Sequence, residues 1–359
     1  MFYLLPLLAT IAWPAGPAQG ALLLDNIKVY GYFDLGYFQT TGPKFAGGGP
    51  DDPDMENGAF DLRHFNILTD ITVRQNLFVK MHIEFEHGIN PSSEEASLVM
   101  EYGFAEYVVK DALKLRAGKM LTPIGIFGEI HDATPAYLSV SPPETFYRPF
   151  RKGGVMLAPK WNTGLMLMGT LAVTPDAPEL EYALYVGNGE SRITTNEAEN
   201  DDNPNKALGF RLQLITAGDI LNVGVSGYKG DKAQDKTHMR LPHTSLSGHI
   251  SANFKGFNIM AEYGRSDLNG EIETTWYVQT SLRIGAVTPY FRYQSLNPNQ
   301  KILDDSWVIW VGGVNIILTD GVYLKLEWDE NRRGRGNEYL ITGEDKDFGE
   351  FQSSLTMMF

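Results

Sequence analysis

The stretch Leu113–Arg151 reads LKLRAGKMLTPIGIFGEIHDATPAYLSVSPPETFYRPFR and changes character part-way. Apolar and basic residues alternate from Leu113 to Ala117, and the alternation stops at Thr122-Pro123. A connection this long is either disordered or a functional loop. Its apolar and aromatic content argues against a solvated tail: Ile124, Ile126, Phe127, Tyr137, Leu138, Phe146, Tyr147 and Phe150. The stretch predicts a loop folded back into the mouth of a large β-barrel.

The rest of the chain is dominated by residues that alternate between apolar and polar. In Thr274–Ile284, Trp276, Val278 and Leu282 alternate with residues that include Gln279 and Arg283. The same pattern covers 77–86 and 208–214. One apolar and one charged face over about ten residues is typical of a transmembrane barrel strand. A soluble sandwich also alternates, but its strands are usually nearer five or six residues. The pattern therefore favours an all-β transmembrane antiparallel barrel.

Connections between these runs alternate between short and long, for example Lys255-Gly256 against Asn188–Asn205. Short periplasmic turns and long extracellular loops are the pattern of outer-membrane barrels. Treating Gly153–Pro159 as a strand would break the alternation and give an odd strand count. Placing it in the loop gives about sixteen strands, an even number as bacterial barrels have. We therefore predict that 121–162 is the third extracellular loop, folded inward as a constriction.

Composition excludes several kinds of protein. The chain has 359 residues, no cysteine and a net charge of −14. Acidic balance argues against nucleic acid as a partner, and the lack of cysteine excludes disulfides, thiolate metal sites and c-type haem attachment. We expect no cofactor. Residues 1–20 are apolar and end in Ala18-Gln19-Gly20, which predicts a signal peptide followed by one barrel domain at 21–359. No Lys or Arg precedes Lys28, so the alternative is a buried N-terminal segment.

The C-terminal run Phe348–Phe359, FGEFQSSLTMMF, alternates and ends in phenylalanine. This resembles the C-terminal insertion signal of outer-membrane barrels. Val29–Gln39, VYGYFDLGYFQ, resembles the opening strand of bacterial porins. Leu115–Glu129 and the proline-rich run after it resemble the fifth strand and third loop of the phosphate-selective porin O and P-like group. The sequence has no dense arginine ladder or lysine cluster, so the resemblance does not extend to phosphate specificity.

The resemblance implies a porin in the outer membrane of a Gram-negative bacterium, with both termini periplasmic. Such a protein passes small hydrophilic solutes or ions by passive diffusion, forms a homotrimer and lies among outer-membrane lipids and lipopolysaccharide. Its third loop narrows the channel. We expect no enzyme activity. Two alternatives stay open: a barrel that serves as scaffold or sheath for a partner protein, and, less favoured, an outer-membrane hydrolase.

Alternation and the loop together predict the residues that line the pore or its constriction. These candidates are Lys80, His82, Glu84, Arg116, Glu129, His131, Asp132, Arg148, Arg151, Arg211, Arg283, Arg292 and Lys325. Rings of Arg and Lys favour anions, so the wall predicts an anion-leaning channel. The alternative is that the arginines pair with carboxylates and only keep the wall wetted.

Two strands, Leu165–Val173 and Trp307–Leu318, are apolar on both faces. The inward loop is expected to cover one of their inner faces; the alternative is that both strands line a subunit interface. The acidic segment Asn196–Asn205 lacks the spacing of a calcium loop, and we expect it to be solvated. His82, Glu84 and Glu86 share a face and lie close enough for a proton relay or a metal. No nucleophile of defined context accompanies them, so we expect no enzyme activity there, and we expect no metal site.

Overall fold

The computed structural model describes residues 26–41, 58–89, 96–130, 133–147, 157–172, 177–190, 205–233, 240–334 and 347–359. Four candidate residues lie outside these ranges: His131, Asp132, Arg148 and Arg151. The predicted signal peptide at 1–20 and most of the acidic segment also lie outside them. Within the described ranges, no helix is both long and apolar enough to cross a membrane.

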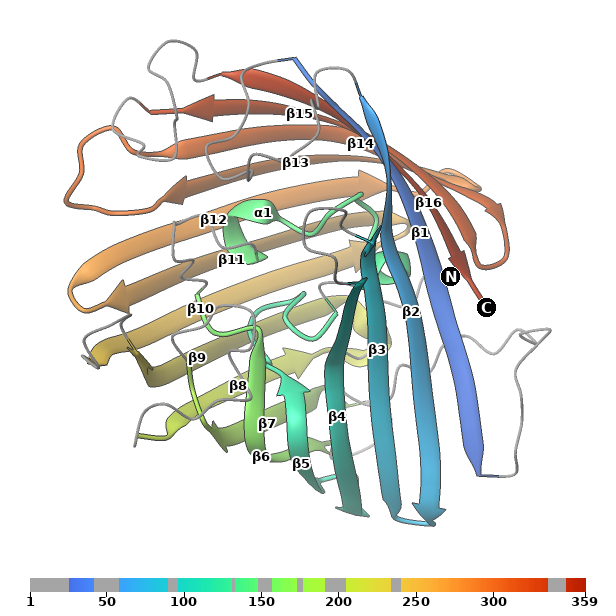
Figure 1. Cartoon of the computed structure of the whole chain (residues 1–359), viewed down its shortest axis with the longest axis vertical. Helices are drawn as coiled ribbons and strands as arrows, with labels where there is room; N and C mark the ends of the chain where they lie inside the picture. The colour runs from blue at the N-terminus through green and yellow to red at the C-terminus, as the bar shows by residue number, and fades with distance from the viewer. Residues whose placement is uncertain are drawn as a thin grey trace.

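Most of the described chain is β-strand, in one sheet (Figure 1). The strands are β1 (Ile27–Thr40), β2 (Ala59–Arg74), β3 (Leu77–Ile89), β4 (Ala96–Lys110), β5 (Leu113–Leu121), β6 (Trp161–Leu171), β7 (Glu179–Gly187), β8 (Ala207–Ile215), β9 (Leu221–Ala233), β10 (Arg240–Phe254), β11 (Phe257–Leu268), β12 (Glu271–Leu282), β13 (Val287–Asn297), β14 (Trp307–Thr319), β15 (Val322–Arg333) and β16 (Phe348–Met358). The short helices are η2 (Thr134–Ala136), α1 (Glu144–Tyr147) and η4 (Ala217–Asp219).

The sheet closes on itself. Every strand pairs antiparallel with its sequence neighbours, and β1 pairs with β16, with Leu35 opposite Leu355. Closure leaves no open sheet edge, which a membrane-spanning sheet requires. The predicted antiparallel barrel of sixteen strands is therefore confirmed over the described residues.

The C-terminal phenylalanine takes part in this closure. Gly31 donates its N–H to the Phe359 carbonyl at 2.9 Å, and Phe359 donates to the Gly31 carbonyl at 3.0 Å. The Phe359 ring stacks on Phe65, with centroids 5.8 Å apart. The last residue thus joins the two ends of the sheet through backbone and side chain.

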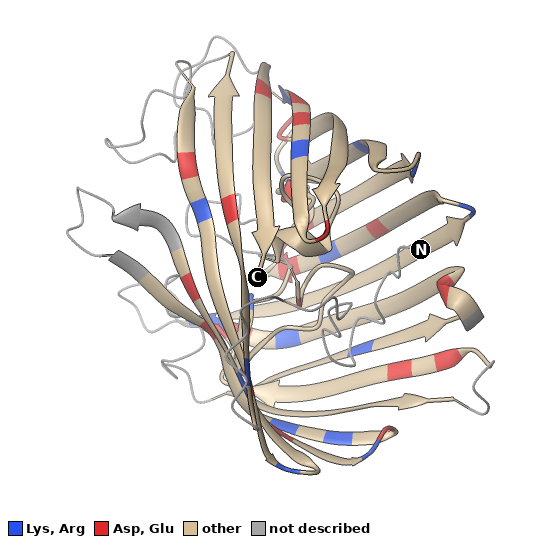
Figure 2. Ribbon diagram, turned by 90° about the vertical axis from the view of Figure 1, so that its right-hand side faces the viewer, with Lys and Arg blue, Asp and Glu red and all other residues tan. Residues whose placement is uncertain are grey.

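The alternation predicted from the sequence is seen in the structure. On β12, Trp276 is exposed on the outer face while Tyr277 and Gln279 are buried on the inner face. Figure 2 shows that basic and acidic residues are interspersed along the strands. Apolar residues face outward and polar residues inward, as in a transmembrane barrel.

The connections alternate as predicted with one exception: Asn269 and Gly270 form a two-residue turn between β11 and β12 at the end that otherwise carries the long connections. Lys255 and Gly256 both have positive φ, 48° and 87°, as the two central residues of a type I′ hairpin turn require. The two-residue turns at 75–76, 111–112 and 320–321 lie at the same end of the barrel. The start of β1 and the end of β16 also lie at this end, because Tyr32 pairs with Met358.

The longest break in the described strands falls between β5 and β6. Of the segment Gly153–Pro159, residues 157–159 are described and are not strand, and β6 begins at Trp161. The predicted even count therefore holds. Helix α1, within this break, contacts β12 and β13 from inside the barrel (Figure 1). We call residues 122–130, 133–147 and 157–160 the inward loop.

Candidate functional site

The apolar side of the inward loop packs on the inner face of the barrel wall. Ile126 and Phe127 belong to one buried cluster with Met166 and Met168 of β6. Further along the loop, Leu138 packs against a second cluster. That cluster consists of Tyr290, Leu296, Trp307, Ile309 and Val311. The loop therefore covers both apolar inner faces, where the sequence predicted that it covers one.

Glu262 on β11 is the main acceptor for the first part of the loop. It accepts the backbone N–H of Ile126 and, at 2.6 Å, the hydroxyl of Tyr147. The Phe127 N–H donates to the same tyrosine oxygen at 2.9 Å. Burial, together with the nearby Glu262 carboxylate, raises the pKa of Tyr147 well above its usual range. Tyr147 therefore stays protonated and can donate to Glu262.

A glycine on the wall makes room for the end of the loop. Gly264 faces inward on β11, and a Cβ there would lie 2.3 Å from Leu157 Cδ1 and 3.1 Å from Phe146 Cε2. Leu157 and Phe146 are both buried. The loop packs so closely on β11 because Gly264 has no side chain.

Basic residues farther around the wall, on β2 and β15, bind the middle of the loop. Arg63 of β2 donates to the Val140 carbonyl at 2.8 Å and to Ser141 Oγ at 3.0 Å. The Lys325 ammonium on β15 donates to three loop carbonyls at 2.5, 2.8 and 2.9 Å. These carbonyls belong to Thr134, Tyr137 and Ser139. The inward loop thus crosses the lumen and is held from both sides.

Arg292 belongs to this same anchor. Its guanidinium donates to the Ser141 carbonyl at 3.2 Å and lies 3.7 Å from Glu327 Oε1. Glu327 in turn accepts the Val140 N–H at 3.2 Å. Arg292 and Lys325 are fully buried. Both residues therefore hold the loop rather than face open solvent.

A charged cluster lies where the loop passes β5 and β8. Glu129 Oε1 lies 3.6 Å from Arg116, and its other oxygen accepts from Arg211 at 2.5 Å. Arg116 also binds Glu106 at 2.7 Å and lies 4.1 Å above the Phe104 ring. Two guanidinium groups therefore share two carboxylates, and the cluster is close to neutral.

The other candidates lie apart from this cluster. Lys80 is 3.9 Å from Asp70. His82 bonds to Asn66, whose amide donates to Glu84 at 3.0 Å. Arg283 lies beyond the end of β12, where it donates to the Gly285 carbonyl at 3.2 Å. Among the candidates that the structure describes, Arg116, Arg211 and Glu129 therefore form one cluster, His82 and Glu84 share Asn66, and Arg292 and Lys325 anchor the loop.

Sequence reasoning missed three of the residues that position the loop: Arg63, Ser226 and Glu262. Ser226 Oγ accepts the Gly125 N–H at 3.0 Å. Glu262 could have been found, because alternation along β11 puts it on the inner face. Arg63 could not have been found in this way. The β1–β2 register shifts between Asp34 and Leu35 of β1, which pair with His64 and Leu62, so the alternation along β2 is interrupted at Arg63.

A hydrogen-bonded series of Glu190, His243 and Ser266 resembles the order of a hydrolytic triad. His243 Nδ1 bonds to Glu190, and its Nε2 lies 2.8 Å from Ser266 Oγ. Ser266 is only 1% exposed. This burial leaves the Ser266 hydroxyl little open access in the structure. Among the described residues, no group of His, Asp and Glu is placed to hold a metal ion.

Solved structures of outer-membrane proteins share this barrel. OmpF of Salmonella typhi, in a complex with daunomycin, matches 93% of this chain and 98% of its own, with a TM-score of 0.64 and 12% identity. The chain has the fold of an outer-membrane porin. The outer-membrane channel DcaP of Acinetobacter baumannii matches 92% of this chain and 97% of its own, with a TM-score of 0.57 and 10% identity. OmpT, an outer membrane protein of Vibrio cholerae, matches 94% of this chain and 100% of its own, with a TM-score of 0.57 and 12% identity.

Comparison by sequence matches a smaller part of the chain than comparison by structure. No protein-family model matches the chain. An uncharacterized protein of Aquifex aeolicus is 25% identical over 178 residues, which are 48% of this chain. The match spans about a third, 35%, of that relative's length. The likeness to porins is therefore one of fold, and the resemblance to the phosphate-selective group stays a prediction.

Proposed function

We propose that the protein is an outer-membrane porin: a water-filled channel for passive diffusion of small hydrophilic solutes or ions. The observation that carries the proposal is a closed barrel, apolar outside and polar inside, with a loop bound across its lumen. Barrels of sixteen strands enclose an aqueous channel. In this arrangement the inward loop sets the size of solute that passes, and both termini face the periplasm.

The described contacts favour a channel over a sheath for a partner protein. The inward loop binds Arg63 on one wall and Glu262 on another, so it occupies space that an enclosed partner would need. An enzyme is not favoured either, because the hydrolase-like series found among the described residues is buried.

The anion preference expected from the sequence is not supported by the pairing of charges. Arg116 and Arg211 share Glu129, Arg292 faces Glu327, and Lys325 binds backbone carbonyls. The arginine contacts support the alternative, in which inner arginines pair with carboxylates, while Lys325 is taken up by uncharged carbonyls of the loop. We therefore propose weak ion selectivity rather than a phosphate or anion filter.

The proposed assembly is a homotrimer. This rests on the resemblance of the sequence to porins and on the barrel fold; a trimer form of the Vibrio cholerae OmpT has been solved. Chemical cross-linking of the purified protein, followed by denaturing electrophoresis, tests it: a ladder ending at three subunits is expected, and a single band at one subunit contradicts it.

Planar-bilayer recording tests the channel. The refolded protein should give stepwise, ohmic conductance, and in a potassium chloride gradient its reversal potential should lie close to zero. Insertion without any conductance contradicts the porin and favours the sheath. A large reversal potential of either sign leaves the porin standing but contradicts the proposed weak selectivity.

A further inference from the structure

One ion pair on the inner face of β2 and β3 keeps contact with water, although the inward loop crosses the lumen. The side chains of Asp70 and Lys80, 3.9 Å apart, are 31% and 16% exposed. The Arg292–Glu327 pair, which holds the loop on β13 and β15, is by contrast fully buried. Lys80 is the fourth residue of β3, close to the short-turn end of the barrel. At that end, the inner wall around β2 and β3 therefore faces the open part of the lumen.

The exposed pair belongs to a patch that spans four neighbouring strands. Lys80 of β3 lies opposite Asp70 of β2 and opposite Phe104 of β4. Two residues along β4, Glu106 lies opposite Arg116 of β5. Because neighbouring strands are ~4.8 Å apart, the patch extends about 14 Å around the wall. We call it the β2–β5 patch; it consists of Asp70, Lys80, Tyr102, Phe104, Glu106 and Arg116.

The centre of the β2–β5 patch is aromatic. The rings of Tyr102 and Phe104 lie 5.4 Å apart and are inclined by 34° to each other. Tyr102 is partly exposed, at the edge of the buried cluster that contains the start of the inward loop. The electron-rich face of an aromatic ring attracts the weakly positive C–H groups of a saturated ring such as a sugar. Tyr102 can therefore bind the apolar face of a solute that is otherwise hydrophilic.

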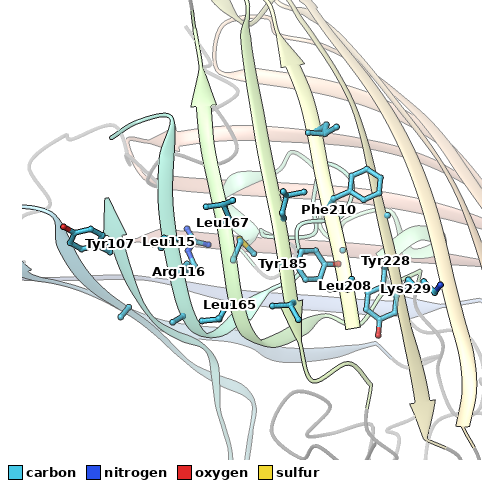
Figure 3. Close-up of a pocket in the computed structure, with 18 of the residues that line it drawn as sticks. Tyr107, Leu115, Arg116, Leu165, Leu167, Tyr185, Leu208, Phe210, Tyr228 and Lys229 are labelled. Carbon is cyan, nitrogen blue, oxygen red and sulfur yellow. The ribbon is translucent and has the colours of Figure 1, made fainter. Parts of the chain in front are cut away.

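The rest of the patch consists of ion pairs that can still form hydrogen bonds. Figure 3 labels Arg116 beside Leu115 on β5; Leu115 is exposed on the outer face, so its neighbour Arg116 points into the barrel. Arg116 donates to Glu106 through Nε at 3.0 Å and Nη2 at 2.7 Å, and both bonds end on Oε2. A guanidinium has five N–H donors and a carboxylate has two acceptor oxygens, so the pair retains capacity for a hydroxyl group. The Asp70–Lys80 pair offers the same two kinds of group.

The pairing of charges disfavours a charged solute at the patch. An anion at Arg116 would lie beside Glu106, 2.7 Å away, and Glu129, 3.6 Å away. A cation at Asp70 would lie beside Lys80. An uncharged solute with several hydroxyl groups meets neither repulsion, and each of its hydroxyl groups can both donate and accept.

We propose that the β2–β5 patch binds an uncharged sugar, with one face of the sugar ring on Tyr102 and its hydroxyl groups at the two ion pairs. The inference rests on the proposed porin function and adds the class of solute that the lumen recognises. Conduction requires binding that is weak enough for the solute to leave again. The expected dissociation constant is therefore on the order of 10 mM.

Sugar titration of single channels in a planar bilayer tests the patch. Glucose should lower the conductance of the wild-type channel along a saturating curve, with half of the effect on the order of 10 mM. Sorbitol, which has similar hydroxyl groups but no ring, should give only the unsaturated decrease that viscosity causes. Inorganic phosphate should leave the glucose curve unchanged.

The outcomes separate the sugar site from the channel. Absence of any conductance contradicts the porin function itself. A conducting channel on which glucose has no saturating effect overturns the sugar site alone. An equal effect of sorbitol, or competition by phosphate, also overturns it.

Two variants test the two parts of the patch. Tyr102→Leu should raise the half-saturating glucose concentration about two- to tenfold, and Tyr102→Phe, which keeps the ring, should restore it. The double variant Asp70→Ala, Lys80→Ala keeps the net charge and should raise it about fivefold, with the reversal potential unchanged. Tyr263→Leu, on the outer face of β11, is the matched control. Heat-dependent gel mobility confirms that each variant is folded. An unchanged glucose titration in both Tyr102→Leu and the double variant overturns the site.

Discussion

Single inward-facing side chains decide where the loop lies. A buried carboxylate is costly unless it accepts hydrogen bonds, and Glu262 accepts them from Ile126 N–H and Tyr147 Oη. Lys325 donates hydrogen bonds to three loop carbonyls, those of Thr134, Tyr137 and Ser139. Each of these wall residues therefore stabilises one conformation of the loop against withdrawal.

Gly125 is the most sensitive position in this arrangement. Its φ is +59°, and a Cβ there would lie 2.4 Å from Tyr147 Oη and 2.6 Å from Glu262 Oε1. Gly125→Val should weaken loop docking by roughly 1–3 kcal/mol, because it adds backbone strain and separates these two groups. We expect faster protease cleavage of the loop in the folded barrel. Gly312→Val, where a Cβ would meet nothing within 4 Å, is the control. Equal protection in both variants contradicts this account.

Glu129 sets the charge of the cluster that it forms with Arg116 and Arg211. Glu129→Gln leaves Arg116 and Arg211 without the carboxylate that they share. A unit charge at ~5–8 Å in water-like surroundings is worth about 0.5–0.8 kcal/mol, so chloride permeability relative to potassium should rise about two- to fourfold. The reversal potential in a salt gradient measures it. Glu330→Gln, on the outer side of β15, is the control and should leave the reversal potential unchanged. If Glu129→Gln leaves it unchanged too, the Glu129 cluster does not lie in the ion path.

At the scale of elements, β16 closes the barrel and depends on its last residue. Phe359 contributes two backbone hydrogen bonds with Gly31 and a ring stacked on Phe65. The alternation of Phe348–Phe359 predicted the outward face of this strand, and the structure has Leu355 and Met357 on that face. The hydrogen bonds between Phe359 and Gly31 could not be predicted from the sequence of either strand alone.

Phe359→Ala should weaken this closure. The ring is 49% exposed, so its loss should cost about half of the ~3–5 kcal/mol typical of a buried phenylalanine. A urea titration followed by heat-dependent gel mobility should therefore show a lower unfolding midpoint. Phe254→Ala, 65% exposed near the same end, should lower it less. If the two variants unfold alike, the closing contact adds nothing to stability.

At the scale of the whole molecule, the sequence predicted more of the barrel than of the loop. Alternation depends only on neighbours in one strand, so it placed Tyr277 and Trp276 on opposite faces correctly. The contact of Ile126 with Glu262 joins residues 136 positions apart, so it depends on the path of the loop. Charge sign alone also misled: Arg292 and Lys325 face inward as predicted, but they bind the loop.

The most direct test of the account is the single-channel conductance of a barrel without the crossing part of its loop. Deleting Gly128–Tyr147 should leave heat-dependent gel mobility intact and raise conductance severalfold, because the loop no longer spans the lumen between Arg63 and Glu262. A deletion of residues 336–345, in another connection, is the control and should keep the wild-type value. A folded deletion variant with wild-type conductance would contradict the claim that the inward loop narrows the channel.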